Sequence, residues 1–215
     1  MNTTTAKMVV PYITSWDSEL KSIASPTHRL EVRDVPTRGG LVREVYYSDE
    51  IPHDRDPAGV LWGRQISRRG QGKPMFSKVH AGRQRRAVMK ALCQVCGAPS
   101  DTNPEGTLWV LVGNEARHWN EHGYTLTGNP PICAACVPVA QGLCPAVRRH
   151  HAVVRARRAE AWGVAGALVG TDDRPELPYG HPVLRMVLAM QMLVFIADPD
   201  RYTGTAPDHA LTKEE

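Results

Sequence analysis

The fold is decided by two short stretches, Cys93-Gln94-Val95-Cys96-Gly97 and Cys133-Ala134-Ala135-Cys136, with thirty-six residues between Cys96 and Cys133. Within each pair, the two intervening residues let the chain turn so that both sulfurs point at one ion. Four thiolates fill the tetrahedral coordination of a structural zinc and leave no position for a substrate. The sequence therefore predicts one zinc cofactor, bound by Cys93, Cys96, Cys133 and Cys136.

Two histidines offer a competing ligand set. His118 and His122 are spaced for one face of a helical turn, and with Cys93 and Cys96 they would imitate a two-Cys, two-His zinc finger. Twenty-one residues separate Cys96 from His118, whereas DNA-reading fingers use about twelve. That ligand set would also leave the second Cys pair unexplained, so the four-Cys site is the preferred prediction.

The fifth thiol, Cys144, follows Cys136 by eight residues. Because four thiolates already complete a tetrahedron, we predict that Cys144 is a small buried apolar side chain and not a ligand. The alternative is a nucleophilic Cys144 activated by His150 or His151.

Length and composition bound the class of protein. The 215 residues suffice for one large domain or two small ones. Residues 1–16 contain one Lys and no apolar run, which is not the pattern of a secretory signal. The longest apolar stretch, Val183 to Ala197, is shorter than the ~20 residues that span a bilayer. These features predict a cytoplasmic protein with no membrane partner, whose cysteines bind metal in preference to forming disulfides.

Basic residues are segregated along the chain, although the net charge is only +4. No acidic residue occurs between Asp56 and Asp101 or between Glu121 and Glu160. Lys and Arg that neutralise phosphates release condensed counterions, so basic windows beside a zinc site predict contact with DNA or RNA. The residues predicted to bind nucleic acid are Arg68, Arg69, Arg83, Arg86 and Lys90.

Three of these basic residues define a face of a helix predicted over Val79 to Leu92. Arg83, Arg86 and Lys90 share one stripe, which should face solvent beside the zinc module. The opposite, apolar stripe should pack on the module and comprises Val88, Met89 and Leu92. The alternative is that the basic side chains pair with the acidic N-terminal segment, through Asp49, Glu50, Asp54 or Asp56, and have no external partner.

Apolar periodicity predicts an α+β fold. The predicted strands are Gly40–Tyr47, Val60–Ile66, Leu108–Val112, Ala152–Arg157 and Trp162–Val169. Further helices are predicted at Cys136–Val147, ending at Pro145, and at Pro182–Ala197, where the apolar composition on most sides indicates burial. Residues 1–40 and the tail from residue 198 carry little pattern and are expected to be irregular.

The chain is expected to form one compact domain with three regions. These are an N-terminal strand and loop region over 1–78, a zinc-binding module over 79–150, and C-terminal strands and a helix over 151–215. Trp62, Trp109 and Trp162 lie in strand contexts and are expected in the core. Trp119 lies in a polar segment, so we expect it on the surface, where with Arg117 it would contact a base or a peptide.

A zinc knuckle, a hairpin and a short helix that carries the second Cys pair resemble, in that order, a treble-clef zinc module over Leu92 to Val147. The phrase Leu92-Cys93-Gln94-Val95-Cys96-Gly97, followed by Asn129-Pro130-Pro131-Ile132-Cys133-Ala134-Ala135-Cys136, is similar to the frame of HNH endonucleases. That resemblance implies a structural metal on the Cys pairs, a His in the hairpin as general base, and a metal-binding His directly after the last Cys.

The chain departs from the HNH pattern at both catalytic places. The hairpin strand reads Leu108-Trp109-Val110-Leu111 without an Asp-His pair, and Val137 follows Cys136. The resemblance therefore implies a catalytically silent relative without nuclease activity. The rest of the chain is loosely similar to actinobacterial or phage-like hypothetical proteins.

Three functions are consistent with these patterns. The first is a zinc-dependent nucleic-acid-binding or regulatory protein, which the basic windows favour. The second is a protein-interaction or assembly module, in which zinc rigidifies a surface for a protein partner. The third is an enzyme on the zinc scaffold, with His80, His118, His122 or Cys144 at an active site that the sequence does not assemble.

Overall fold

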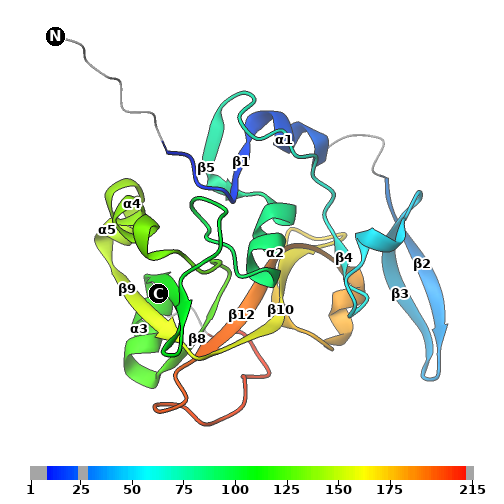
Figure 1. Cartoon of the computed structure of the whole chain (residues 1–215). Helices are drawn as coiled ribbons and strands as arrows, with labels where there is room; N and C mark the ends of the chain where they lie inside the picture. The colour runs from blue at the N-terminus through cyan, green and yellow to red at the C-terminus, as the bar shows by residue number, and fades with distance from the viewer. Residues whose placement is uncertain (1–8, 24–28, 212–215) are drawn as a thin grey trace.

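The computed structural model describes residues 9–23 and 29–211 and combines helices with strands (Figure 1), which confirms the α+β class. The strands are β1 Thr14–Trp16, β2 Leu30–Thr37, β3 Gly40–Tyr47, β4 Leu61–Trp62, β5 Pro74–Val79, β6 Thr102–Asn103, β7 Gly106–Val112, β8 Tyr124–Thr127, β9 His151–Ala156, β10 Arg158–Leu168, β11 Glu176–Pro178 and β12 Val187–Ala197. The α-helices are α1 Asp17–Ile23, α2 Ala81–Met89, α3 Asn114–His122, α4 Val137–Leu143 and α5 Pro145–Arg149. Short 3-10 turns are η1 Pro52–Asp54, η2 Ala134–Cys136 and η3 Pro182–Met186. No helix among these residues is long and apolar enough to cross a membrane.

The main sheet is built around β12. β10 pairs with β12 antiparallel along its whole length, from Arg158 opposite Ala197 to Leu168 opposite Val187. At the other edge of β12, β4 pairs in parallel with its first half and β8 pairs antiparallel with its second half. β11 extends the sheet beyond β10. β12 is therefore the central strand of the sheet.

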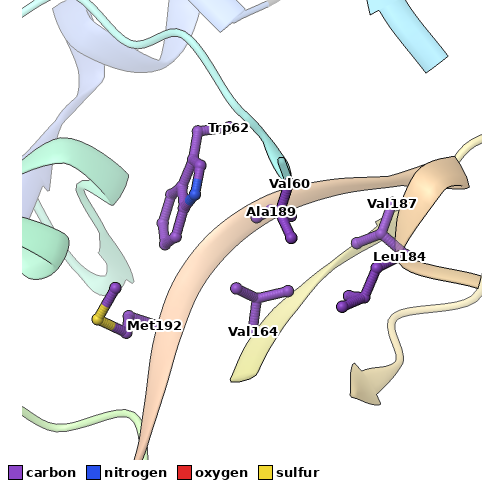
Figure 2. Close-up of a cluster of buried hydrophobic side chains, with 7 residues drawn as sticks. All are labelled: Val60, Trp62, Val164, Leu184, Val187, Ala189 and Met192. Atoms are coloured by element: carbon purple, nitrogen blue, oxygen red, sulfur yellow. The ribbon is translucent and has the colours of Figure 1, made fainter. Parts of the chain in front are cut away.

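Both faces of β12 are buried. Figure 2 shows one apolar cluster against it, formed by Val60, Trp62, Val164, Leu184, Val187, Ala189 and Met192. A second cluster covers the opposite face and contains Leu126, Trp162, Leu193, Phe195 and Ala197. A strand buried on both faces has apolar residues at consecutive positions and loses the alternation that identifies half-buried strands.

The helix predicted over Pro182–Ala197 is wrong. Only its first five residues form a helical turn, η3, and the rest is β12. A continuous apolar run fits a buried helix and a doubly buried strand equally well by periodicity alone. The β-branched and aromatic residues of Val194-Phe195-Ile196 favour the strand, because such side chains pack well on a pleated surface.

A glutamine fills the gap in the edge of β12 between β4 and β8. The Gln84 side chain on α2 donates to the Met192 carbonyl (2.8 Å) and accepts from the Met192 N–H (3.0 Å). Its amide also donates to the Gly128 carbonyl at 2.8 Å. The buried amide thus makes the hydrogen bonds that a neighbouring strand would make at Met192, so α2 covers the open edge there and pairs its backbone groups.

β7 is also buried on both faces and joins the main sheet to the segment that carries the cysteines. Leu108 and Val110 pack on Cys93 and Cys136. Trp109 and Leu111 point to the other side and pack on α3 and on β12. β7 pairs antiparallel with β9, and the short β6 pairs with its start. The alternation of one strand therefore connects two separate cores.

Some of the predicted strands and irregular segments agree with the structure, and others do not. β3 has the predicted bounds, and β7 and β9 begin within two residues of theirs. The predicted strand Val60–Ile66 is shorter and contributes only β4. Residues 1–40 were expected to be irregular, yet they contain β1, α1 and β2, while 1–8 and 24–28 lie outside the described residues. The chain after Asp198 is not loose, because Ala206, Ala210 and Leu211 pack on the main sheet.

The predicted burial of the tryptophans is also only partly confirmed. Trp62, Trp109 and Trp162 are buried, as predicted. Trp119, predicted on the surface, is only 5% exposed and packs between β7 and β12. The surface prediction treated its segment as a loop, whereas the segment forms α3 and directs Trp119 inward while its polar neighbours face solvent.

α2 buries a different face from the one predicted. Met89 is 57% exposed, whereas Ala81, Arg83, Gln84 and Ala87 are buried. The predicted solvent-facing stripe is therefore wrong at Arg83. Two small alanines let the helix approach the sheet closely, and the two polar side chains between them form hydrogen bonds with groups that the helix covers.

Arg83 is bound by a buried carboxylate. Its two terminal nitrogens donate to the two oxygens of Glu19, each at 2.7 Å, and one also donates to the Thr14 carbonyl. The carboxylate of Glu19 also accepts hydrogen bonds from the N–H groups of Trp16 and Arg68. Burial raises the pKa of Glu19, but these donors outweigh burial and hold its pKa below the ordinary value. Glu19 thus ties α1, α2 and the loop before β5 together.

We expect Arg83→Met to lower the free energy of unfolding by about 3–5 kcal/mol, because it leaves the Glu19 carboxylate buried without its partner. Arg86→Met removes a neighbouring exposed arginine and should change stability by less than about 0.5 kcal/mol. Urea unfolding of the two variants measures both values. Equal stability of the two variants would contradict the tethering role of Arg83.

Candidate metal centre

The first Cys pair lies in a tight turn directly after α2. The N–H of Cys93 donates to the Ala98 carbonyl (2.7 Å), and the N–H of Gly97 donates back to the Cys93 carbonyl (2.8 Å). Gly97 has φ of +78°, which glycine adopts without a steric penalty. The Tyr12 ring covers the place where a Cβ would stand, at 2.8 Å. Both the backbone conformation and this close contact require glycine at the turn.

The second Cys pair is held against the first by backbone hydrogen bonds. The N–H of Gln94 donates to the Pro131 carbonyl at 2.9 Å, and the N–H of Ile132 donates to the Leu108 carbonyl at 2.9 Å. Cys133 precedes η2, and α4 begins directly after Cys136. Pro138 stands in the first turn of α4, where a missing N–H costs nothing.

The four sulfurs converge. The Sγ atoms of Cys93, Cys96, Cys133 and Cys136 all lie within 4.8 Å of one another, and Cys96 and Cys133 are 3.8 Å apart. A tetrahedral ion with metal–sulfur bonds of about 2.3 Å places its sulfurs about 3.8 Å apart. Within the described part of the chain this is the one group of three or more His, Cys, Asp or Glu side chains close enough to hold a metal ion.

The chemistry of the thiols also fits a cation. Burial and the neighbouring Cys133 and Cys93 thiols raise the pKa of Cys136 far above its ordinary value. Burial raises the pKa of Cys93 as well, but backbone N–H groups of Cys96, Cys133 and Val95 outweigh burial and lower it. Thiolates this close repel one another, so all four ionise together only when a cation balances their charge.

Cys144 lies outside the four-sulfur group. The predicted helix Cys136–Val147 is interrupted at this residue, because α4 ends at Leu143 and α5 begins at Pro145. The half-buried Cys144 packs on the apolar cluster around Cys93 and Cys136, which agrees with an apolar role. In the described residues no hydrogen bond joins Cys144 to a histidine, and His151 lies instead against Gln141 at 3.0 Å.

The other histidines considered for catalysis do not converge on a site. His118 and His122 both lie on α3, with ring centroids 4.4 Å apart, and His118 Nδ1 is 2.9 Å from the Tyr124 carbonyl. His80 caps α2 by accepting the Arg83 N–H, so its other nitrogen carries the proton and donates to the Ile66 carbonyl. Burial lowers the pKa of His80, which favours this neutral form.

The structure also reveals a residue that sequence reasoning missed, Glu115 at the start of α3. Its carboxylate accepts hydrogen bonds from the Thr127 hydroxyl (3.0 Å) and the Asn129 amide (3.1 Å). Asn129 begins the segment that enters the second Cys pair, so Glu115 anchors that segment. Its partners lie twelve and fourteen residues away and form no motif with it.

The predicted nucleic-acid-binding residues divide into one buried and four exposed. Arg83 is buried against Glu19, whereas Arg68, Arg69, Arg86 and Lys90 are exposed. Arg69 lies 5.7 Å from the ring of Tyr12, which itself covers Gly97. The loop that carries Arg68 and Arg69 is therefore close to the first Cys pair.

The acidic residues considered as their partners are engaged elsewhere. Arg64 pairs with Asp49 and Asp54, and Arg55 pairs with Glu50. Asp56 accepts hydrogen bonds from the side chains of Trp62 and Tyr179. Among the described residues, no ion pair joins an acid to the four exposed basic residues.

No protein-family model, curated protein or solved structure matches the chain. The first Cys pair, the β6–β7 hairpin and α4 follow the order of a treble clef, with α3 and β8 inserted before the second pair. The treble-clef and HNH resemblances thus stay predictions that rest on this order and on the four sulfurs.

We expect each single change of Cys93, Cys96, Cys133 or Cys136 to Ser to lower the metal content of the purified protein, because each removes a converging sulfur. Cys144→Ser is the matched control and should leave the metal content unchanged. Elemental analysis after gentle purification gives the readout. Loss of metal on changing Cys144, or retention of metal in the other four variants, would show that the ligand set is different.

We expect the buried carboxyl group of Glu115 to make the stability of the protein depend on pH. Burial raises the pKa of Glu115 from 4.5 to about 7. Between these values the folded protein keeps a proton that the unfolded chain releases, so this stabilisation is complete below pH 4.5 and is lost as the pH rises through about 7. Glu115→Gln cannot titrate, so its stability relative to wild type should rise between pH 5 and pH 8.

Urea unfolding at those two pH values measures the change, and the difference between the two proteins cancels the titration of other groups. Glu121→Gln, an exposed change on the same helix, should follow wild type at both values. A Glu115→Gln variant whose stability stays parallel to wild type would contradict the raised pKa.

Proposed function

We propose that the chain is a zinc protein in which the four-thiolate centre is structural, and that the basic surface beside this centre binds DNA or RNA. The convergence of four sulfurs within 4.8 Å is the observation that supports the zinc. Soft thiolate ligands in a tetrahedron select zinc or iron over hard cations such as Mg²⁺ or Ca²⁺. A site filled by four thiolates has no open position, which supports a structural role.

Two features support zinc as a folding requirement. Both Cys pairs stand in short turns and pack in one small apolar cluster, which also contains Val95, Leu108, Val110, Ile132 and Val147. Cys96 is exposed, so the outer side of the centre has no apolar cover. A structural zinc supplies on the order of 10 kcal/mol of binding free energy to such a module.

The zinc proposal predicts close to one zinc per chain, with little iron, in protein purified from a medium that contains both. Removal of the metal with a strong chelator should lower the unfolding temperature, and zinc should restore it. An iron-loaded protein, or a metal-free protein with the same unfolding temperature, would contradict the structural zinc.

The nucleic-acid proposal is supported by a contrast between two groups of arginines. Arg33, Arg55, Arg64 and Arg155 pair with carboxylates, and such pairs contribute to the fold. The basic surface, defined as Arg68, Arg69, Arg86 and Lys90, is exposed and carries no such pairs within the described residues. Its residues come from α2 and from the loop before β5, which Glu19 ties to α2. Phosphates are the partners that unpaired surface cations of this kind bind best.

We expect wild-type affinity for random duplex DNA to fall steeply with salt. The double change Arg86→Ala, Lys90→Ala should reduce the log–log slope by about 1.8, from ~0.9 per lost phosphate contact. The matched control is Arg174→Ala, Arg185→Ala, which removes two exposed arginines from other elements and should leave the slope unchanged. Fluorescence anisotropy between 50 and 200 mM salt, roughly the range in which such contacts weaken most, gives the readout.

Absence of binding to DNA and to RNA at low salt would remove this function. It would leave the assembly module as the second candidate, which a different feature favours. An apolar cavity of about 580 Å³ lies beside the metal centre between β5, β7 and α4–α5. Phe76 and Leu143 on its edge are more than half exposed, and such apolar exposure is typical of a contact surface.

A further inference from the structure

A second cavity lies on the opposite side of β7 from the metal centre. Its volume is about 720 Å³, within the range of small-molecule sites. Trp109, Met192 and Val194 form a buried apolar floor, and exposed residues of α2 and β10 form the rim. The cavity shares no cysteine with the metal centre, so its chemistry is separate from that of the zinc.

Arg85 is a charged group of this cavity that has no hydrogen-bond or ion-pair partner among the described residues. Its guanidinium lies 4.6 Å from the ring centroid of Trp62 and makes no hydrogen bond or ion pair with any described residue. The side chain is half-buried, so fewer water molecules reach it than reach an exposed arginine. A guanidinium held over an indole ring is fixed in position, yet its five N–H donors remain available.

The acidic groups of the cavity do not satisfy Arg85, because each is engaged by other donors. Asp56 accepts hydrogen bonds from two backbone N–H groups, the Trp62 indole and the Tyr179 hydroxyl, all within 3.1 Å. Glu160 is bound by both sides of the Arg158 guanidinium. Lys90 on the rim adds a second positive charge. The wall thus offers unpaired cations, and its carboxylates are already satisfied.

We propose that this cavity binds a small organic anion, with its acidic group held by Arg85 and its apolar body against the floor of Trp109, Met192 and Val194. A planar guanidinium binds carboxylate, sulfonate or phosphate groups through two parallel hydrogen bonds, and these are stronger than bonds between neutral groups.

Two dyes with the same ring system test the proposal. Anilinonaphthalene sulfonate carries an anion on an apolar body, and N-phenylnaphthylamine is the same body without the anion. We expect the sulfonate to bind wild type more tightly than the neutral dye. Arg85→Met should weaken the sulfonate by about 10- to 100-fold and leave the neutral dye unchanged. Arg86→Met, the matched change at an exposed neighbour outside the cavity, should alter neither.

The place of binding needs its own pair of variants. Ala161→Trp puts a bulky ring into this cavity and should exclude both dyes. Ala146→Trp does the same to the apolar cavity beside the metal centre and should exclude neither. Dye fluorescence titrations give the affinities, and unchanged metal content and unfolding temperature confirm that each variant is folded. Sulfonate binding that survives Ala161→Trp, or that Arg85→Met leaves unchanged, would overturn the proposal.

Discussion

The two-sided burial of β7 is the constraint on which the rest of the structure depends. Leu108, Trp109, Val110 and Leu111 are consecutive and all at most 7% exposed. Such a run is stable only when separate cores cover the two faces of the strand. One core consists of the cysteines and their neighbours, and the other consists of α3 and the main sheet. The cysteines pack against β7 in a cluster that also includes Ile132 and Val147, so the segment that carries them shares its packing with the sheet.

The parts of the fold that the sequence predicts well are those with local rules. Spacing within each Cys pair brings two sulfurs together, and the pattern of Gly40–Tyr47 predicts a strand whose bounds the structure confirms. The sequence also predicts that the two Cys pairs bind the same ion, because four thiols at this spacing have few other uses in one chain. The structure brings these four sulfurs together, which is the part of the site that could be predicted.

The errors fall where long-range contacts override local patterns. The apolar run of β12 has no period because both faces are covered by segments distant in the chain. The buried face of α2 carries Arg83 and Gln84, which any amphipathic rule assigns to solvent. They are buried because Glu19, 64 residues away, and Met192, 108 residues away, satisfy them. A polar residue with a distant partner looks the same in the sequence as a polar residue in water.

The same reasoning separates basic residues that serve the fold from those that remain for a partner. The sequence pattern does not distinguish Arg83, Arg85 and Arg86, because they are neighbours in one acid-free window. In the structure Arg83 is neutralised by Glu19, Arg85 lies over Trp62 in a cavity, and Arg86 faces solvent. One turn of α2 therefore presents a structural arginine, an anion-binding candidate and a surface charge, because successive helical residues point about 100° apart.

β7 also lies between the two cavities and contributes residues to both. Val110 and Val112 line the cavity beside the metal centre, whereas Thr107 and Trp109 line the cavity that contains Arg85. A slip of one residue in the pairing of β7 would exchange these faces. The register is held next to the second Cys pair, where the Leu108 N–H donates to the Asp101 carbonyl and the Leu108 carbonyl accepts from the Ile132 N–H. A metal bound to Cys133 would therefore also fix Ile132, and through it the face on which Trp109 stands. In this way the proposed metal would determine the floor of a cavity that it does not touch.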